Sequence, residues 1–313
     1  MISLERIARI VDADSVTVLV TDSGLGGLSV VAEIERRARE AGDGRSLRVV
    51  FANALPEAGR GYNTMTSAEG KARVFAAALA GITRAVRPDV VLVACNTLSV
   101  LLPRVRGATD VPVLGIVGLG VDMLEERLRA VGDSTAIVFA TETTVEADAH
   151  RAALIERGIA VERIVTQACP RLASEIERDA TSDLIASMID RFAAEAMALV
   201  TRKGDAVIAG LCCTHYGYCA EQFRQAVRRH GARSVEILDP SERMARVLFP
   251  ESRTFRGDGG HVSIRVVSRA AISDAEVRSI AALIYPASAA TAAALRAWER
   301  RTDLFPFDEH GSG

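Results

Sequence analysis

A chain of 313 residues with 38 basic and 40 acidic side chains has a net charge of −2, so charge alone draws it neither to nucleic acid nor to an anionic membrane. Aromatic residues make up only 4% of the chain, which argues against a base-stacking platform for single-stranded nucleic acid. The length suggests roughly two domains, the longest apolar run (111–121) is too short for a membrane span, and charges near the N-terminus interrupt any signal-peptide core, so we expect a cytoplasmic protein.

Apolar runs typical of buried strands alternate with helical patterns along the whole chain. Residues 1–15 are expected to form an N-terminal arm before the fold begins, either as an amphipathic helical turn or as a frayed segment. Thr66 and Glu69 stand at capping-box spacing and predict the start of a long helix. This alternation predicts an α/β fold with parallel sheets covered on both faces. The expected strands are 16–21, 47–52, 90–93, 111–117, 135–140, 160–165, 206–211, 235–238 and 262–268, and the expected helices include 66–86, 182–200, 274–284 and 287–301.

A glycine-rich loop, Asp22–Gly27, follows the first predicted strand and precedes a helix. Its glycines would let backbone N–H groups approach an anion at the helix start. It is not the dinucleotide-binding fingerprint, because Ser29 occupies the third glycine position, and a glycine-rich turn can also serve packing alone. Asp22 favours a functional interpretation, since a carboxylate at the buried end of a strand is costly unless it is used.

Two distant stretches each place a thiol and a hydroxyl residue after an apolar strand, namely Ala94–Thr97 and Cys213–Tyr216. The carboxyl ends of parallel strands are where α/β sheets bind ligands. We therefore predict that Cys95 and Cys213 act as a pair of acid/base thiols on opposite faces of one substrate. The ordinary pKa of a thiol, about 8.5, lets cysteine serve either as an acid or as a base.

The remaining cysteines are interpreted as buried packing residues. An odd total of five cysteines is a poor disulfide framework, so we expect reduced thiols. Cys212, Cys213 and His215 could in principle bind a metal ion, but neighbouring residues at a strand end point apart and zinc sites favour two intervening residues. We therefore expect no metal. The packing cysteines are Cys169, Cys212 and Cys219.

Six motifs in order resemble those of glutamate racemases, in the aspartate/glutamate racemase superfamily. The resemblance spans residues 16–285 and implies two pseudo-symmetric, doubly wound α/β half-domains with the active site in the cleft between them. It implies half-domains at 16–117 plus 226–285 and at 118–225, with a C-terminal helical extension at 286–313. It also implies no metal, pyridoxal phosphate, flavin or other cofactor. The motifs are Thr21–Gly27, Ala94–Thr97, Pro112–Gly115, Ala140–Val145, Ala168–Pro170 and Cys213–Tyr216.

The same resemblance assigns roles to individual residues. Cys95 would deprotonate the D-enantiomer and Cys213 the L-enantiomer, each returning the proton when the other removes it. Asp22 would assist the first thiol, His215 the second, and Glu177 would support His215. The resemblance further implies a homodimer that interconverts L- and D-glutamate for peptidoglycan, with no nucleic-acid or membrane partner. The residues expected to hold the substrate's carboxylate and amino groups are Ser23, Asn96, Thr97, Thr141, Thr144 and Thr214.

The sequence departs from the family pattern around the substrate side chain. The loop 53–63 is longer than the usual Pro-Tyr-Gly segment, Asn53 replaces an aspartate, and Gly217 replaces a proline. Arg60 could pair with a distal carboxylate or simply face solvent. Substrate identity is therefore open, with glutamate and then aspartate favoured.

Two other functions stay open at this point. One is isomerisation or decarboxylation of a small dicarboxylic acid by the cysteines. The other is a non-catalytic descendant that binds an acidic metabolite, which the altered loop and the added C-terminal segment favour. That segment could also form an added interface.

Overall fold

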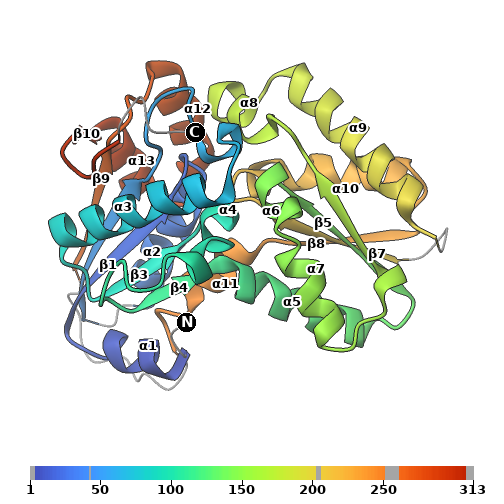
Figure 1. Ribbon diagram of the computed structural model, residues 1–313, viewed down its shortest axis with the longest axis horizontal. Helices are drawn as coiled ribbons and strands as arrows, with labels where there is room; N and C mark the ends of the chain where they lie inside the picture. Colours follow the sequence, from blue (N-terminus) through green and yellow to red (C-terminus); the bar gives the residue numbers. More distant parts are fainter. Residues whose placement is uncertain (1–3, 42–43, 202–205, 251–260, 308–313) are drawn as a thin grey trace. The chain divides into compact units, whose positions relative to one another are not determined.

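Two parallel sheets, each with helices on both faces, organise the chain (Figure 1). The computed structural model describes residues 4–41, 44–201, 206–250 and 261–307. The chain divides into two compact units, residues 1–116 with 241–313 and residues 117–240. The predicted α/β class with two doubly wound sheets is confirmed.

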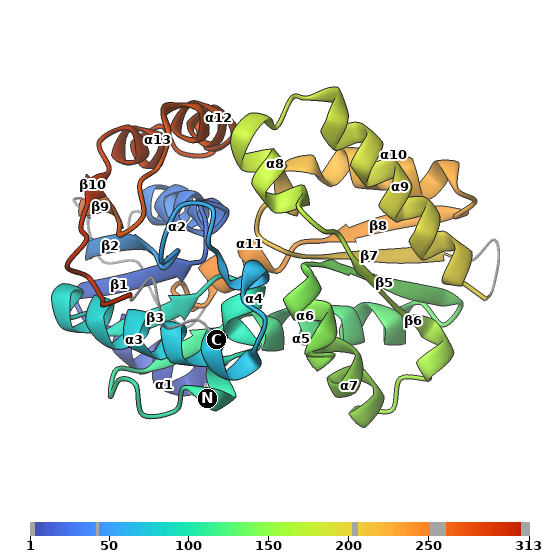
Figure 2. The ribbon, with the colours of Figure 1, turned by 45° about the horizontal axis from the view of Figure 1, so that its top comes forward.

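The first unit is built on a six-stranded sheet in the order β10-β9-β2-β1-β3-β4. Its apolar strands are buried on both sides, as expected for a parallel sheet. Helices α2, α12 and α13 cover one face and α3 covers the other (Figure 2). The strands are β1 (Ser15–Asp22), β2 (Ser46–Asn53), β3 (Val90–Val93), β4 (Val113–Gly115), β9 (His261–Ser268) and β10 (Glu299–Arg300). The helices are α1 (Leu4–Val11), α2 (Leu28–Ala41), α3 (Ala68–Val86), α4 (Asn96–Ser99), α11 (Pro240–Arg246), α12 (Asp274–Ile284) and α13 (Ala289–Arg296).

The second unit is built on a four-stranded sheet in the order β6-β5-β7-β8. Helices α8, α9 and α10 lie on one face, and α5, α6 and α7 lie on the other (Figure 2). The strands are β5 (Ser134–Ala140), β6 (Ile164–Ala168), β7 (Ala206–Cys212) and β8 (Ser234–Leu238). The helices are α5 (Ile116–Ala130), α6 (Glu142–Glu146), α7 (Ala149–Glu156), α8 (Leu172–Asp179), α9 (Asp183–Leu199) and α10 (Ala220–Arg229).

The two sheets repeat one strand order. In the first unit β1 lies between β2 and β3, and in the second β5 lies between β6 and β7. After the central strand, β1 or β5, the chain first forms the neighbour on one side, β2 or β6. A later crossover then forms the neighbour on the other side, β3 or β7. This reversal creates a switch point, the place where open α/β sheets bind ligands. The carboxyl ends of β1 and β3, and of β5 and β7, are thus equivalent positions in the two units.

The boundary between the units differs from the one that the resemblance implied. Residues 226–240 were expected in the first half-domain, but β8 pairs with β7 from Ala206↔Ser234 to Gly210↔Leu238 and so belongs to the second unit. The chain passes between the units at Ile116–Val117 and at Pro240–Ser241.

Two local predictions are wrong in detail, and a third is settled between its two alternatives. The strand expected at 160–165 begins only at Ile164, because residues 161–163 form a 3-10 turn whose Arg163 donates to the carbonyls of Leu128, Val131 and Ser134. The long helix is capped by Ser67, which accepts from the Gly70 amide, rather than by Thr66. In the N-terminal arm the helical alternative holds, since it contains the helix α1, whose Ile7 and Val11 are fully buried.

The C-terminal segment is part of the first unit's core, not a separate helical extension. The helix expected at 287–301 ends at Arg296, and Glu299–Arg300 add a short strand beside β9. Leu304 and Phe305 are buried in the hydrophobic cluster that α3 forms on the sheet. Residues 308–313 of the expected extension lie outside the described residues.

Gly81 of α3 permits this close approach, and its replacement gives a test of it. A Cβ at Gly81 would lie 1.9 Å from the carbonyl oxygen of Leu304. We expect Gly81→Ala to lower the free energy of unfolding by about 1–3 kcal/mol through overpacking, measured by urea denaturation. Gly132→Ala is the matched control, since a Cβ there meets no atom within 4 Å, and it should change stability by less than about 0.5 kcal/mol. Equal stability of the two variants would contradict the packing of the C-terminal segment.

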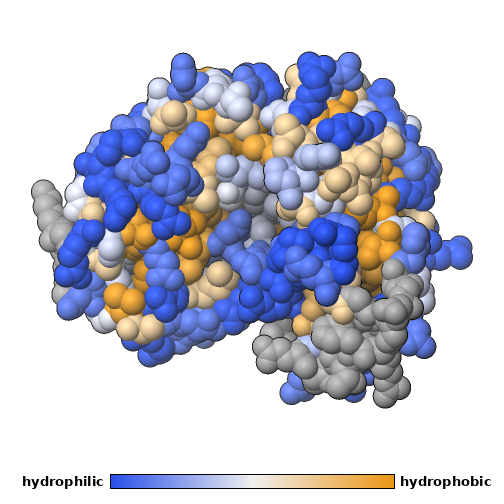
Figure 3. Space-filling view, turned by 180° about the vertical axis from the view of Figure 1, so that it is seen from behind, coloured by the Kyte–Doolittle hydropathy of each residue, from blue (hydrophilic) through white to orange (hydrophobic). Residues whose placement is uncertain are grey.

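The surface is mixed in character. The face in Figure 3 shows separate hydrophobic patches within a largely hydrophilic surface. The exposed large apolar residues come from several different elements, and within the described part of the chain no helix has the length and apolarity that crossing a membrane requires. These residues are Ile155, Val161, Leu184, Leu199 and Tyr285.

Candidate active site

The first group of predicted residues meets at the carboxyl ends of β1 and β3. Asp22 is the last residue of β1, and Cys95 follows β3 as the N-cap of α4. The Cys95 sulfur lies 3.1 Å from the Ser23 hydroxyl, and the Asp22 carboxylate accepts a hydrogen bond from the Ser23 amide at 2.6 Å. The structure therefore brings Asp22, Ser23 and Cys95 together, all of them predicted from the sequence.

The surroundings of Cys95 favour its protonated form. Burial raises the pKa of the thiol, and the charge of Asp22 raises it further. Hydrogen bonds from Ser23 and from the backbone amide of Leu98 act in the opposite direction, because they stabilise a thiolate. Cys95 is thus a weak acid within the field of the Asp22 carboxylate.

The glycine-rich loop has a packing role that holds Asp22 in place. A Cβ at Gly27 would lie 2.9 Å from Asp22 Oδ2 and 3.1 Å from the ring of Phe51. Only glycine permits this approach without displacing the carboxylate. The packing interpretation of this turn is therefore supported. The group that the turn packs against is the Asp22 carboxylate, the same group that favoured a functional interpretation.

Asn96 is buried with its amide unused. Only 2% of this residue is exposed, and neither its Nδ2 nor its Oδ1 has a hydrogen-bond partner among the described residues. A buried amide without partners costs about 1–3 kcal/mol, so such a group points to a ligand. Thr97, the next residue of α4, is equally buried.

The loop 53–63 begins and ends beside the group that Asp22, Ser23 and Cys95 form, the Cys95 group. Its first residue, Asn53, pairs with Asp22 across β1 and β2, and the Ala54 amide donates to the Asp22 carbonyl at 2.7 Å. At the far end Tyr62 is fully buried, and burial together with the charge of the Cys95 sulfur raises its pKa. Both ends of the loop therefore lie near residues of the Cys95 group.

Arg60 is engaged within this loop. Its guanidinium lies 3.3 Å from the Glu57 carboxylate and 5.5 Å from the ring centroid of Phe307. The side chain remains 42% exposed. The structure thus places Arg60 at the rim of the loop with one acidic and one aromatic neighbour.

The second group of predicted residues meets after β7. Cys213 follows this strand, and its sulfur lies 3.7 Å from Nδ1 of His215. Nε2 of His215 lies 2.7 Å from the Glu177 carboxylate, which comes from α8. Thr214, between the thiol and the imidazole, is buried as well. A carboxylate–imidazole–thiol line therefore connects residues that are far apart in the sequence.

The imidazole of His215 is held in its charged form. Burial opposes the charge, but the carboxylate of Glu177 and the hydrogen bond with the Cys213 sulfur outweigh it and raise the pKa of His215 well above its ordinary value. A positively charged imidazole therefore lies next to the Cys213 sulfur. The second group thus differs from the first, in which a carboxylate lies beside the thiol.

Thr141 and Thr144 meet after β5, the strand that neighbours β7. Thr141 caps α6, its hydroxyl lies 3.0 Å from that of Thr144, and it accepts from the Thr144 amide at 3.4 Å. Both residues are buried. They occupy the position in the second unit that Asp22 and Ser23 occupy in the first.

Two buried tyrosines next to the sulfurs were not predicted to matter. Tyr62 lies in the field of Cys95, and Tyr216 lies in the field of Cys213 and donates to the carbonyl of Cys169 at 3.3 Å. Burial is the largest cause that raises the pKa of Tyr216. The only sequence signal was the position of each tyrosine in a loop after a strand, which does not distinguish a wall of a site from core packing.

The other cysteines and Gly217 have structural surroundings. All five cysteines are buried and unpaired, and Cys212 packs into the core cluster of α5 and β5 while Cys213 faces His215. A Cβ at Gly217 would lie 2.1 Å from Oδ2 of Asp239. Gly217, which stands where the family pattern has a proline, therefore leaves room for the side chain of Asp239.

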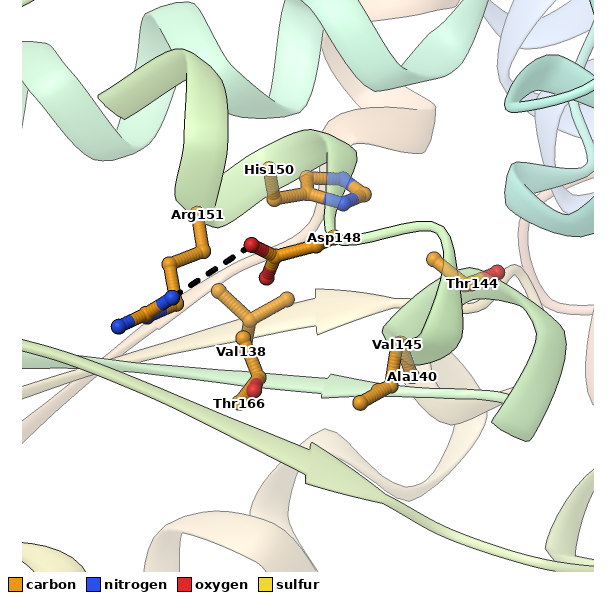
Figure 4. Close-up of a pocket in the computed structure, with 8 residues that line it drawn as sticks. All are labelled: Val138, Ala140, Thr144, Val145, Asp148, His150, Arg151 and Thr166. Carbon is orange, nitrogen blue, oxygen red and sulfur yellow. Dashed lines mark hydrogen bonds and ion pairs between the residues drawn. The ribbon is translucent and has the colours of Figure 1, made fainter. Parts of the chain in front are cut away.

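A pocket in the second unit adjoins these groups only through Thr144. Figure 4 shows it between β5, β6 and the start of α7, with Asp148 and Arg151 paired at 3.5 Å. Of the predicted residues only Thr144 lines it. His150, also in its wall, is almost fully buried, and burial lowers its pKa to about 4, so this imidazole is neutral.

Comparison with known proteins identifies the family to which this chain belongs. The chain is 32% identical to a glutamate racemase of Synechococcus sp. (strain CC9605), over 72% of this chain and 76% of that protein, and 30% identical to one of Trichodesmium erythraeum (strain IMS101), over 74% and 77%. Among solved structures, it shares its fold with the glutamate racemase of Francisella tularensis subsp. tularensis SCHU S4 in complex with D-glutamate, with a TM-score of 0.63, 20% identity, and coverage of 87% of this chain and 94% of that one. The glutamate racemase of Aquifex pyrophilus gives a TM-score of 0.61 at 24% identity, over 86% of this chain and 94% of that one. Residues 18–248 match the model of the Asp/Glu/Hydantoin racemase family, and the chain belongs to that family.

Proposed function

We propose that this protein is a cofactor-independent amino-acid racemase that interconverts L- and D-glutamate by means of two thiols. The observation that carries the proposal is the equivalence of Cys95 and Cys213, which follow β3 and β7 at the same position of two sheets with the same strand order. Racemisation needs one proton removed from Cα and another delivered to the opposite face. Two thiols in equivalent places supply one group for each face.

The two sulfurs start in different protonation states in this proposal. Cys95 is the thiol, because burial and Asp22 raise its pKa, and Cys213, whose sulfur lies 3.7 Å from Nδ1 of His215, takes the role of the base. L-Glutamate then loses its Cα proton to Cys213 and receives one from Cys95. This step leaves Cys95 without its proton and Cys213 with one, which is the state from which the return reaction starts. A second conversion of L-glutamate requires Asp22 and His215 to reset the two protons first.

Buried polar groups would hold the substrate's carboxylate and amino groups during this exchange. Negative charge develops from Cα into the carboxylate when the proton leaves, and preorganised donors stabilise it. The amide of Asn96 is the strongest candidate, since it is buried and has no partner among the described residues. The other proposed contacts are Ser23, Thr97, Thr141, Thr144 and Thr214.

Asn96 gives a prediction that separates binding from folding. We expect Asn96→Ala to raise KM for glutamate by roughly tenfold to a hundredfold, because a hydrogen bond to a charged group contributes about 1.5–3 kcal/mol. The free energy of unfolding should change little, since the amide makes no hydrogen bond to a described residue that folding would lose. Steady-state kinetics and urea denaturation measure the two quantities. A large loss of stability with unchanged KM would show that Asn96 is a structural residue.

Arg60 is the proposed contact for the substrate's distal carboxylate. It lies in the loop 53–63, and its neighbours in the structure include a carboxylate, that of Glu57. An acidic substrate side chain could take the place of Glu57 with the same charge and geometry. This supports glutamate as the first substrate to test and aspartate as the second.

The direct test is a racemisation assay without added cofactor. Purified protein treated with EDTA is incubated with L- or D-glutamate and, separately, with both aspartate enantiomers, and optical rotation is followed. We expect either glutamate enantiomer to approach the racemate. No change with any of the four would overturn the proposed function. A covalent substrate adduct on one cysteine would instead favour isomerisation or decarboxylation of a dicarboxylic acid.

Two wider expectations accompany the proposal. The D-glutamate formed would supply peptidoglycan synthesis in the cytoplasm, and the protein would act as a homodimer. Light scattering of the purified protein tests the dimer.

A further inference from the structure

The C-terminal segment 301–307 makes specific contacts with the loop 53–63. Arg269, which directly follows β9, donates through Nη1 to the carbonyl of Pro56 and through Nε to the carbonyl of Phe305 at 3.0 Å. Its guanidinium also lies 5.6 Å from the ring centroids of both Phe305 and Phe307. One side chain thus joins the loop to the C-terminal segment.

Phe307 lies between two arginines. Arg60 of the loop lies 5.5 Å from its ring centroid, and Arg269 lies 5.6 Å from it. The aromatic face attracts both cations, so the ring draws together charges that would otherwise repel. The Phe307 ring is therefore one of the groups that contact the guanidinium of Arg60, together with the carboxylate of Glu57.

The segment that presents Phe307 is itself firmly placed. Leu304 and Phe305 are buried against α3, the Leu304 carbonyl packs on Gly81, and the Arg301 amide donates to the Ser268 carbonyl at 2.8 Å. Phe307 is only half-buried and lies outside that core cluster. Its substitution should therefore leave the core intact. Arg269 and the segment 301–307 also lie beyond residues 18–248, the region that matches the family model.

We propose that the segment 301–307 supports the loop 53–63 in recognising an anionic substrate side chain, with Phe307 and Arg269 as positioning residues. The inference rests on the proposed function, in which Arg60 binds the distal carboxylate. The proposal explains how the loop 53–63, which departs from the family pattern, can still hold Arg60 in a fixed position. The C-terminal segment contacts the loop and orders it.

The test compares Phe307→Leu with Phe307→Tyr in the full-length protein. Leucine keeps apolar bulk but removes the aromatic face, whereas tyrosine keeps it. We expect Phe307→Leu to raise KM for glutamate about fivefold with kcat within roughly twofold, and Phe307→Tyr to keep the wild-type KM. Arg269→Met should have the same effect as Phe307→Leu. Arg301→Met is its control, because Arg301 pairs with Asp303 within the segment and not with the loop.

Amide hydrogen exchange of residues 54–61 provides a readout without substrate. We expect faster exchange in Phe307→Leu and Arg269→Met, and wild-type exchange in Phe307→Tyr and Arg301→Met. An active wild-type enzyme with unchanged KM in Phe307→Leu would overturn the inference, even if the loop exchanged faster. If the wild-type protein has no racemase activity, the proposed function fails, and unchanged loop exchange would then separately overturn the support by the C-terminal segment.

Discussion

Replacing either Cys95 or Cys213 by serine is expected to lower racemisation by roughly 10³-fold or more, because a serine hydroxyl is far too weak an acid to replace a thiol in general acid–base catalysis. Each variant should nevertheless keep one half of the reaction. Cys95→Ser retains the base that acts on L-glutamate, so it should exchange the Cα proton of the L-enantiomer with solvent deuterium without inverting it. Cys213→Ser should do the same with D-glutamate only. Proton NMR in D₂O follows both substrates.

Cys219→Ser is the control for this pair. Cys219 is also a buried thiol, but it is the N-cap of α10, a position where serine is favourable, and no predicted site residue contacts it among the described interactions. Its racemisation rate should remain near that of the wild-type protein. If neither Cys95→Ser nor Cys213→Ser exchanged the Cα proton of either enantiomer, the result would contradict the assignment of one face of the substrate to each sulfur.

Glu177→Gln is expected to narrow the pH range of activity from its alkaline side. The carboxylate of Glu177 is the main group that raises the pKa of His215, against the opposing effect of burial. A histidine with a raised pKa stays charged until the pH passes that pKa, so activity that needs the imidazolium is present at lower pH and lost as the pH rises. Without the carboxylate the pKa falls, and the loss should begin at lower pH. We expect kcat/KM to fall roughly tenfold to a hundredfold near pH 8 and clearly less near pH 6.

The matched control is Glu175→Gln on the same helix. Glu175 is also buried, but its carboxylate pairs with Arg171 at 2.8 Å and Arg178 at 2.7 Å, not with His215. Its loss should leave the pH profile unchanged. Because the two enantiomers have equal free energies, kcat/KM must shift equally in both directions of the reaction, which provides an internal check. A pH profile of Glu177→Gln that matches the wild-type profile would contradict the role given to Glu177.

The positions of both thiols could be predicted from local pattern, because a buried parallel strand leaves a continuous apolar run. Val90–Val93 and Ala206–Cys212 are such runs, and each delivers its cysteine to the carboxyl edge of a sheet. The alternation of strands and helices then gave the α/β class. The contact of Glu177 with His215 crosses from α8 to the end of β7, and no periodicity encodes it, so only the family resemblance pointed to it.

Other features were beyond prediction because their causes are tertiary. The two residues of β10 are too few for a strand pattern, and they pair only because β9 offers an edge. The contact of Arg60 with Phe307 joins residues far apart in the sequence, and no local signal connects them. Residues 226–240 were misassigned because the side on which β8 pairs is decided by packing against β7.

One measurement tests the two-thiol account most directly: the label on Cα in the first product formed from unlabelled L-glutamate in D₂O. Two separate groups, one removing the proton and the other delivering a solvent-derived one, predict D-glutamate that carries deuterium in nearly every molecule at low conversion, while the remaining L-glutamate stays unlabelled. D-Glutamate that retains the original proton would show that a single group serves both faces, and would contradict the pairing of Cys95 with Cys213.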